Sequence, residues 1–226
     1  MNKKQELIDK NIELFFFDPS RERDEFIEFY KSLNPDRVKK EGDRYRYSPL
    51  FLVLKDARYC FAVGKEFNDC RENLHEANFA GIILINIAFN NMVKKIFSGQ
   101  LEKFADQYMD IHDPDELHGL RLLRNSLEHS FYGLYTYENR KNKDGEVEKV
   151  KVYFSLGFYN FIIKKDSDWK RDYPSEMFMI NSRKLFTQFE SGCKKFKNEL
   201  LDRSNTKLRS QFIKYYDVDQ WVATGP

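Results

Sequence analysis

The chain has 226 residues and a formal net charge of +2; hydrophobic residues make up 41% of it and aromatic residues 16%. This composition supports a packed core and excludes an intrinsically disordered chain. Glycine and proline number only 10 and 6, which favours long helices over a β fold with many turns. The nearly balanced charge excludes a protein whose overall field alone would attract nucleic acid.

The sequence predicts one domain over residues 1–226, located in the cytoplasm. The first residues, MNKKQELIDK, contain no apolar stretch of the kind that forms a signal peptide. The longest apolar run, residues 80–89, is interrupted by Asn86 and is too short to cross a bilayer, so no membrane partner is expected. The three cysteines form no Cys-x-x-Cys pair and no zinc-ligand spacing with histidine, which indicates reduced thiols and neither a metal site nor another cofactor.

Four helices are predicted in the first half of the chain, and the first two form an N-terminal helical extension over residues 1–47. Asp18-Pro19-Ser20 is a turn signature that separates these two helices, and Ser48-Pro49 marks the start of the third. The fourth is the most apolar and is expected to be the central core helix. The predicted ranges are 2–17, 21–33, 48–67 and 72–97.

A fifth helix has a well-marked start at Asp113-Pro114-Asp115-Glu116, and its pattern continues to about Tyr135. Asp113 can cap the helix and Pro114 suits its first position. The acidic residues favour the positive end of the helix dipole. At about 100° per residue, one stripe of this helix must face the core: Leu120, Leu123, Leu127, Phe131 and Leu134.

Beyond this helix, residues from about 136 to 181 alternate like short strands. Lys143-Asp144-Gly145-Glu146 suits a hairpin turn, and VEKVKVYFSL and EMFMINS suit strands. Asn181 or Ser182 can cap a closing helix whose apolar stripe is expected to pack against the helix that starts at Asp113; the stripe is Leu185, Phe186, Phe189, Phe196 and Leu200. The predicted fold class is therefore mainly α, a helical bundle with a small β-hairpin insertion before the last long helix.

The face of the fifth helix opposite its core stripe is rich in polar and aromatic groups: His118, Arg121, Asn125, His129 and Tyr132. Asn125 and His129 lie one helical turn apart and can contact the same ligand. Arg124 lies about 140° from His129 around the helix, nearer the core stripe. Leu122 also falls on this polar face and would be unusual in open water. The mixture predicts a symmetric, partly buried interface beside an anion-binding site.

These residue types indicate RNA cleavage without a metal. Imidazole can take and give a proton near neutral pH, and the guanidinium fork matches phosphate oxygens. An amide such as that of Asn125 can orient either group, and the RNA 2′-hydroxyl supplies the nucleophile. The second half of the chain also carries more basic than acidic side chains, a modest indication of an anionic partner.

The segment from Arg124 to His129, Arg-Asn-Ser-Leu-Glu-His, resembles the Arg-x(4–6)-His signature of the HEPN superfamily. Members of this family are helical-bundle proteins, and many are metal-independent endoribonucleases of toxin–antitoxin, abortive-infection and CRISPR-linked antiviral defence. The order of parts over residues 48–205 is also similar: apolar helix, signature helix, variable insert and closing helix. In family members two signature helices meet across a dimer, so each site combines two arginines and two histidines.

The resemblance implies that Arg124 binds the scissile phosphate, that His129 is the base or acid, and that Asn125 orients them. It implies a homodimer that cleaves RNA by 2′-hydroxyl transesterification, with an antitoxin or a regulatory protein as a further partner. Additional RNA contacts are predicted, against the alternative of ordinary solvated or packed surface, for Arg121, Tyr132, Arg140, Lys141 and Lys143. Two other functions stay open. One is a non-catalytic HEPN-like module that binds RNA, a nucleotide or a protein, and the other is a helical interaction protein without a site.

Overall fold

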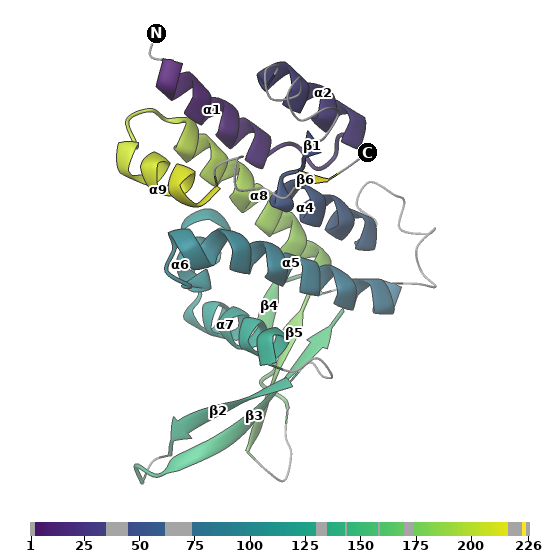
Figure 1. Cartoon of the computed structure of the whole chain (residues 1–226). Coiled ribbons are helices and arrows are strands. Elements are labelled where there is room, and N and C mark those ends of the chain that lie inside the picture. Colours follow the sequence, from purple (N-terminus) through teal and green to yellow (C-terminus); the bar gives the residue numbers. More distant parts are fainter. Residues whose placement is uncertain are drawn as a thin grey trace.

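The computed structural model describes residues 3–34, 45–61, 74–129, 135–142, 144–157, 159–169, 174–216 and 223–224. Within these ranges the chain forms eight helices and six strands (Figure 1). The helices are α1 (Lys3–Phe15), α2 (Arg23–Leu33), α4 (Pro49–Cys60), α5 (Leu74–Ile96), α6 (Leu101–Tyr108), α7 (Pro114–His129), α8 (Ser182–Leu201) and α9 (Thr206–Tyr216). None of them combines the length and the apolar character that crossing a membrane requires.

The strands form two sheets. A short pair joins β1 (Tyr45–Arg46) to β6 (Ala223–Thr224). A four-stranded mixed sheet has the order β2-β3-β5-β4, in which β3 and β5 run parallel and the two outer pairs run antiparallel. Its strands are β2 (Tyr135–Lys141), β3 (Val147–Leu156), β4 (Ile163–Lys165) and β5 (Ser175–Ile180).

The predicted fold class, a mainly α helical bundle with a small β insertion, is wrong, because the chain combines its helices with a four-stranded mixed sheet. The inner face of this sheet contributes Val152, Phe178 and Ile180 to the main cluster of buried residues. The sheet is therefore a structural layer rather than a surface insertion. The parallel pairing of β3 with β5 leaves no local signal in the sequence, and β4 has only three residues.

Several predicted helix starts are confirmed by their caps. The hydroxyl of Ser48 accepts a hydrogen bond from the backbone N–H of Phe51 at 3.2 Å. The side chain of Asn181 accepts one from the N–H of Lys184 at 3.0 Å. Asp113 accepts two, from the amides of Asp115 and Glu116 at 2.9 and 3.1 Å. Such side-chain caps satisfy amide groups that have no partner inside the first turn of a helix.

The predicted hairpin turn between β2 and β3 is also confirmed. The side-chain oxygen of Asn142 accepts hydrogen bonds from the amides of Asp144 and Glu146. Gly145 adopts a positive φ of +82°, a conformation that a residue without Cβ reaches without strain. This turn joins two strands paired in antiparallel register from Tyr135 opposite Tyr153 to Lys141 opposite Val147.

Other boundaries differ from the prediction. The helix expected to continue to about Tyr135 has its described end at His129, and strand β2 begins at Tyr135. Residues 130–134, which include the predicted core residues Phe131 and Leu134, lie outside the described ranges, as do residues 62–73. Helix α6 was not predicted, because residues 101–108 make up only two turns and give a short periodic pattern.

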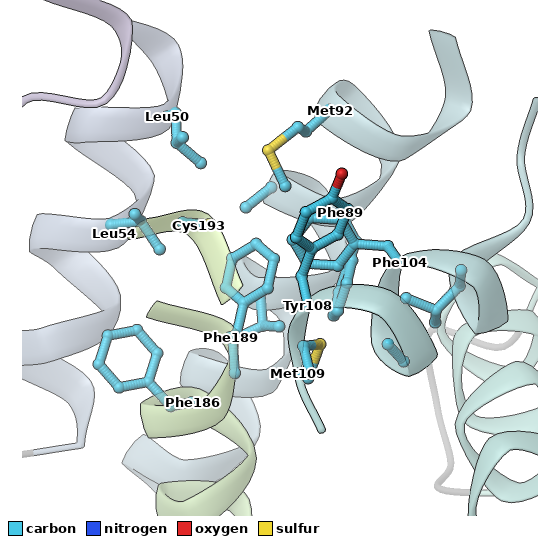
Figure 2. Close-up of a cluster of buried hydrophobic side chains, with 14 of the residues drawn as sticks. Leu50, Leu54, Phe89, Met92, Phe104, Tyr108, Met109, Phe186, Phe189 and Cys193 are labelled. Atoms are coloured by element: carbon cyan, nitrogen blue, oxygen red, sulfur yellow. The ribbon is translucent and has the colours of Figure 1, made fainter. Parts of the chain in front are cut away.

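The centre of the core lies where α8 meets α5 and α6. Figure 2 shows Phe89, Phe104 and Phe189 in this cluster, and all three side chains are buried. The ring centroids of Phe89 and Phe189 are 4.3 Å apart. The whole apolar stripe predicted for the closing helix is buried, but its predicted partner is wrong. Helix α8 packs mainly against α5, α6 and α1, rather than against α7.

Helix α7 instead lies between α6 on one side and the strands β4 and β2 on the other (Figure 1). The approach to the sheet is close at Gly119. A Cβ atom added there would lie 2.7 Å from Cδ1 of Phe178 and 2.8 Å from Cδ1 of Ile163. Both of these side chains are buried, so the helix can reach the sheet only because residue 119 has no side chain.

We expect Phe189→Ala to lower the free energy of unfolding by about 3–5 kcal/mol, because the ring is fully buried against other aromatic rings and its removal leaves a cavity. Urea unfolding would measure this loss. The control is Lys194→Ala on the exposed side of the same helix, for which we expect a change within about 0.5 kcal/mol. A loss below about 1 kcal/mol for Phe189→Ala would contradict the described core.

We expect Gly119→Ala to destabilise the protein by up to about 2 kcal/mol. Alanine gains about 1 kcal/mol of helix propensity, but overpacking a tight contact costs about 1–3 kcal/mol. The test is a double-mutant cycle with Ile163→Val, which removes the Cδ1 atom that the new methyl group would meet. The loss should shrink in the Ile163→Val background. A stabilising effect of Gly119→Ala, or strict additivity, would count against close helix–sheet packing.

Candidate active site

The residues of the HEPN-like motif lie in the last two turns of α7. Arg124 and Asn125 are half-buried, and the backbone of His129 is the last described position of the helix. The side chain of His129 lies outside the described part of the structure, and so do Tyr132 and Lys143. Because Asn125 and His129 are four residues apart in one helix, their Cα–Cβ bonds point to the same side of it.

Arg124 is held by α5 and by the turn that follows it. Its Nε donates a hydrogen bond to Oδ1 of Asn90 at 3.1 Å, and its Nη1 donates one to the carbonyl oxygen of Gly99 at 2.7 Å. Together with Leu120 and Leu123, it borders a cavity of about 20 Å³ between α5 and α7. The guanidinium therefore lies on the α5 side of α7, as its place next to the predicted core stripe indicated.

The predicted core stripe of α7 is confirmed in its described part, since Leu120 and Leu123 are buried and Leu127 packs against the core. Leu122, expected in a dimer interface, is only 2% exposed within one subunit. It follows Gly119 by three residues, so the chain's own sheet accounts for its burial. The burial of Leu122 therefore gives no reason to expect a dimer. The homodimer stays a prediction that rests on the resemblance to HEPN proteins.

Ser126 also lies on the side of α7 that faces the sheet, because it follows Gly119 by two turns. It is fully buried, and among the described residues its hydroxyl has no hydrogen-bond partner.

The first half of α7 is connected to strand β2 by charged groups. Nε2 of His118 lies 3.2 Å from Oε2 of Glu138. Arg121 donates from Nη2 to Oε1 of Glu138 at 2.9 Å, and the same nitrogen lies 2.8 Å from Nδ1 of His118. His118 was predicted on the polar face of this helix, but its contact with Glu138 could not be predicted, because the two residues are twenty positions apart in the chain. Arg121 was predicted to contact RNA, and here it contacts its own sheet.

Strand β2 continues this network to β5 and β4. Arg140 donates to both carboxylate oxygens of Glu176 at 2.6 and 2.8 Å, and to Glu138 at 2.6 Å. Lys165 adds a further hydrogen bond to Glu176 at 2.5 Å. Arg140 was also predicted to contact RNA, but it lies on the inner face of the sheet with its guanidinium directed at two carboxylates. Lys141, the next residue, is exposed on the outer face.

The network changes the acidity of its two carboxyl groups. Burial by itself would raise the pKa of Glu138, but the hydrogen bond and the positive charge of Arg140 outweigh it and hold the pKa below its usual value. The same balance, with Arg140 and Lys165 as the cations, lowers the pKa of Glu176. Both groups are therefore carboxylates at neutral pH. Glu138 connects α7 to the sheet, whereas Glu176 connects the strands β2, β4 and β5.

Among the described side chains, no three His, Cys, Asp or Glu residues are close enough to hold a metal ion. Comparisons with protein families, with curated proteins and with solved structures found no match to this chain. The similarity to HEPN proteins therefore rests on the six motif residues and on the order of the helices.

We expect the free energy of unfolding to fall as the pH drops below about 4.3, the usual glutamate pKa. Both folded pKa values are depressed, so the network's contribution is complete above the unfolded pKa and is lost as the pH falls through the folded values. Urea unfolding between pH 6 and pH 3 would measure this. The loss should be smaller in Glu138→Gln/Glu176→Gln than in the wild type.

The control for this measurement is Glu146→Gln, which changes an exposed glutamate in the hairpin turn. Its pH profile should follow that of the wild type. Parallel profiles for the wild type and the double variant would show that the network contributes nothing to stability over this range.

Proposed function

We propose that the protein is an endoribonuclease that cleaves RNA by attack of a 2′-hydroxyl on the adjacent phosphate. The observation that carries the proposal is the composition of the last two turns of α7. A half-buried arginine fixed by two hydrogen bonds is followed by a half-buried asparagine and, four residues later on the same side of the helix, by a histidine. Location in the cytoplasm belongs to the same proposal, and the free thiols of Cys60 and Cys193 are compatible with it.

In the proposed reaction, His129 removes the proton from the 2′-hydroxyl. The O2′–P bond forms, the P–O5′ bond breaks, and the departing O5′ receives a proton from a general acid. The products are a 2′,3′-cyclic phosphate and a 5′-hydroxyl. One histidine performs one of these transfers, and in the proposed homodimer His129 of the partner subunit performs the other.

Arg124 would stabilise the negative charge that develops on the phosphorus oxygens. Its hydrogen bonds to Asn90 and Gly99 hold the guanidinium in place before substrate arrives. A preorganised charge of this kind stabilises a transition state more than a mobile one, because no reorganisation is needed during the reaction. Asn125, as the adjacent half-buried amide, would orient the phosphate or the imidazole.

A second candidate function is favoured by the same contacts of Arg124. These hydrogen bonds connect α7 to α5 and to the turn before α6, which is also what a purely structural arginine would do. In that case the protein is a non-catalytic HEPN-like module that binds RNA, a nucleotide or a protein partner. An antitoxin or regulatory protein as partner follows from the resemblance alone.

We expect His129→Ala to lower the rate of RNA cleavage at least about 100-fold, because general acid–base catalysis contributes about 10² to 10⁴. Arg124→Ala should cause a comparable loss. Cleavage of a fluorescent oligoribonucleotide in excess EDTA, with identification of the cyclic phosphate, would measure both. DNA of the same sequence should stay intact, because it lacks the 2′-hydroxyl.

The matched control is His112→Ala, which removes an exposed histidine outside the motif. It should cleave RNA at the wild-type rate. Circular dichroism and the melting temperature would establish that the motif variants keep their fold. Wild-type cleavage by His129→Ala, or cleavage that requires an added divalent metal, would reject the endoribonuclease and leave the binding module.

A further inference from the structure

The outer face of the sheet, opposite α7, carries a row of aromatic side chains. Tyr135 and Tyr137 alternate along β2, and the register of the hairpin puts Tyr153 of β3 opposite Tyr135. The ring centroid of Tyr135 lies 6.0 Å from that of Tyr137 and 6.3 Å from that of Tyr153. Tyr137 is 50% exposed, and Figure 1 shows that the β2–β3 hairpin extends beyond the helices.

The row continues towards the loop after β4. Trp169 lies against Tyr153 with a centroid separation of 5.6 Å, and its indole N–H donates a hydrogen bond to the hydroxyl of Ser175 on β5. The hydrogen bond to Ser175 fixes the indole to the sheet, and the contact with Tyr153 makes the indole part of the aromatic surface. Aromatic side chains thus occupy two neighbouring strands and the loop beside them.

Lysine ammonium groups lie among these rings. Nζ of Lys149 is 4.3 Å from the centroid of Tyr137, and Nζ of Lys151 is 4.4 Å from Tyr135 and 4.7 Å from Tyr153. Such cation–π contacts are weak at exposed sites, and long lysine side chains can reorient at little cost. The ammonium groups can therefore move from the rings to a ligand that offers phosphates to them and flat bases to the tyrosines.

Charge is divided between the two faces of the sheet. Side chains alternate along a strand, so the buried positions of β3 and β5 define the inner face, and the acidic strand residues all fall on it: Glu138, Glu148 and Glu176. The described strand positions of the outer face include no acidic residue and four lysines: Lys141, Lys149, Lys151 and Lys164. The strand positions of the outer face therefore carry a net positive charge although the whole chain is nearly neutral.

We infer that the outer face of the β2–β3–β5–β4 sheet binds single-stranded RNA, with bases stacked on the tyrosine rings and phosphates paired with the lysines. Accessible aromatic rings interleaved with cations match the two repeating features of a single strand, its flat bases and its charged backbone. A duplex hides its base faces inside the stack and would use only the lysines. The choice of RNA rests on the proposed function, whereas the stacking surface rests on the sheet alone.

The test measures binding of a 12-nucleotide 2′-O-methyl oligoribonucleotide, labelled with fluorescein, by fluorescence anisotropy. This probe has no 2′-hydroxyl nucleophile, so binding is measured without cleavage. We expect Tyr137→Leu to raise Kd about 10-fold, since a base–aromatic stack is typically worth a factor of about 5 to 150. Tyr137→Phe keeps the ring and should bind within about 2-fold of the wild type.

The lysines are tested by the salt dependence of the same Kd. Each phosphate contact with a single strand contributes about −0.7 to the slope of log K against log salt concentration. Lys149→Ala should therefore reduce the magnitude of the slope by about that amount. The matched controls are Tyr59→Leu and Lys207→Ala, which change an exposed tyrosine and an exposed lysine. They belong to α4 and α9, two helices whose described residues do not pack on the four-stranded sheet. Both should bind like the wild type.

Three results would overturn the inference. The first is equal binding by Tyr137→Leu and Tyr137→Phe. The second is duplex RNA binding as tightly as the single strand. The third is stronger association with vesicles containing anionic phosphatidylserine than with the oligonucleotide, which would assign the face to a lipid surface.

Cleavage assays separate this inference from the proposed function. If both hold, Tyr137→Leu should raise KM for RNA and leave kcat within about 2-fold, because the ring contributes binding that is equal in the ground and transition states. If the chain binds the probe through the tyrosines but cleaves no RNA, the inference stands and the endoribonuclease is rejected. If RNA is cleaved but Tyr137→Leu changes neither Kd nor KM, the RNA-binding face is rejected and the endoribonuclease stands.

Discussion

The contact between α7 and the inner face of the sheet determines which groups of the helix are buried in the fold and which can contact a ligand. At Gly119 the helix backbone comes so near to Phe178 and Ile163 that no side chain fits between them. Leu122, one turn further along the helix, is also buried. At the border of the contact, His118 and Arg121 reach the carboxylate of Glu138. Apolar packing sets the distance, and the charged groups fix the orientation, because hydrogen-bonded ion pairs are directional and dispersion contacts are not.

This contact assigns different tasks to the two ends of α7. The first turns pack on the sheet, and their residues His118 and Arg121 connect the helix to β2. The last turns, with Arg124 and Asn125, follow these ion-paired residues, and Arg124 contacts α5 and the turn after it. The guanidinium of Arg124 is held by its contacts with Asn90 and Gly99, and the proposed binding of a phosphate would require such a fixed position.

Local features of the sequence predicted local features of the structure. The sequence predicted the helix caps and the hairpin turn, because each depends on residues within four positions of one another. These residues are Ser48, Asp113 and Asn181 for the caps and Gly145 for the turn. The extent of the sheet could not be predicted from the sequence. Its parallel pair joins Lys151 to Ser175 across the intervening strand β4, and no local pattern encodes such a pairing. The polar face of α7 was identified, but the helical wheel cannot distinguish a surface covered by the chain's own sheet from one covered by a second subunit.

The turn at Asn142–Glu146 sets more than the direction of the chain. Because side chains alternate strictly across a sheet, shifting one strand by a single residue exchanges its two faces. Here such a slip in β2 would turn Glu138 and Arg140 outward and bring Tyr137 and Asn139 against α7. A one-residue insertion within β2 that shifts its pairing with β3 would therefore exchange the chemical character of both surfaces of the strand at once.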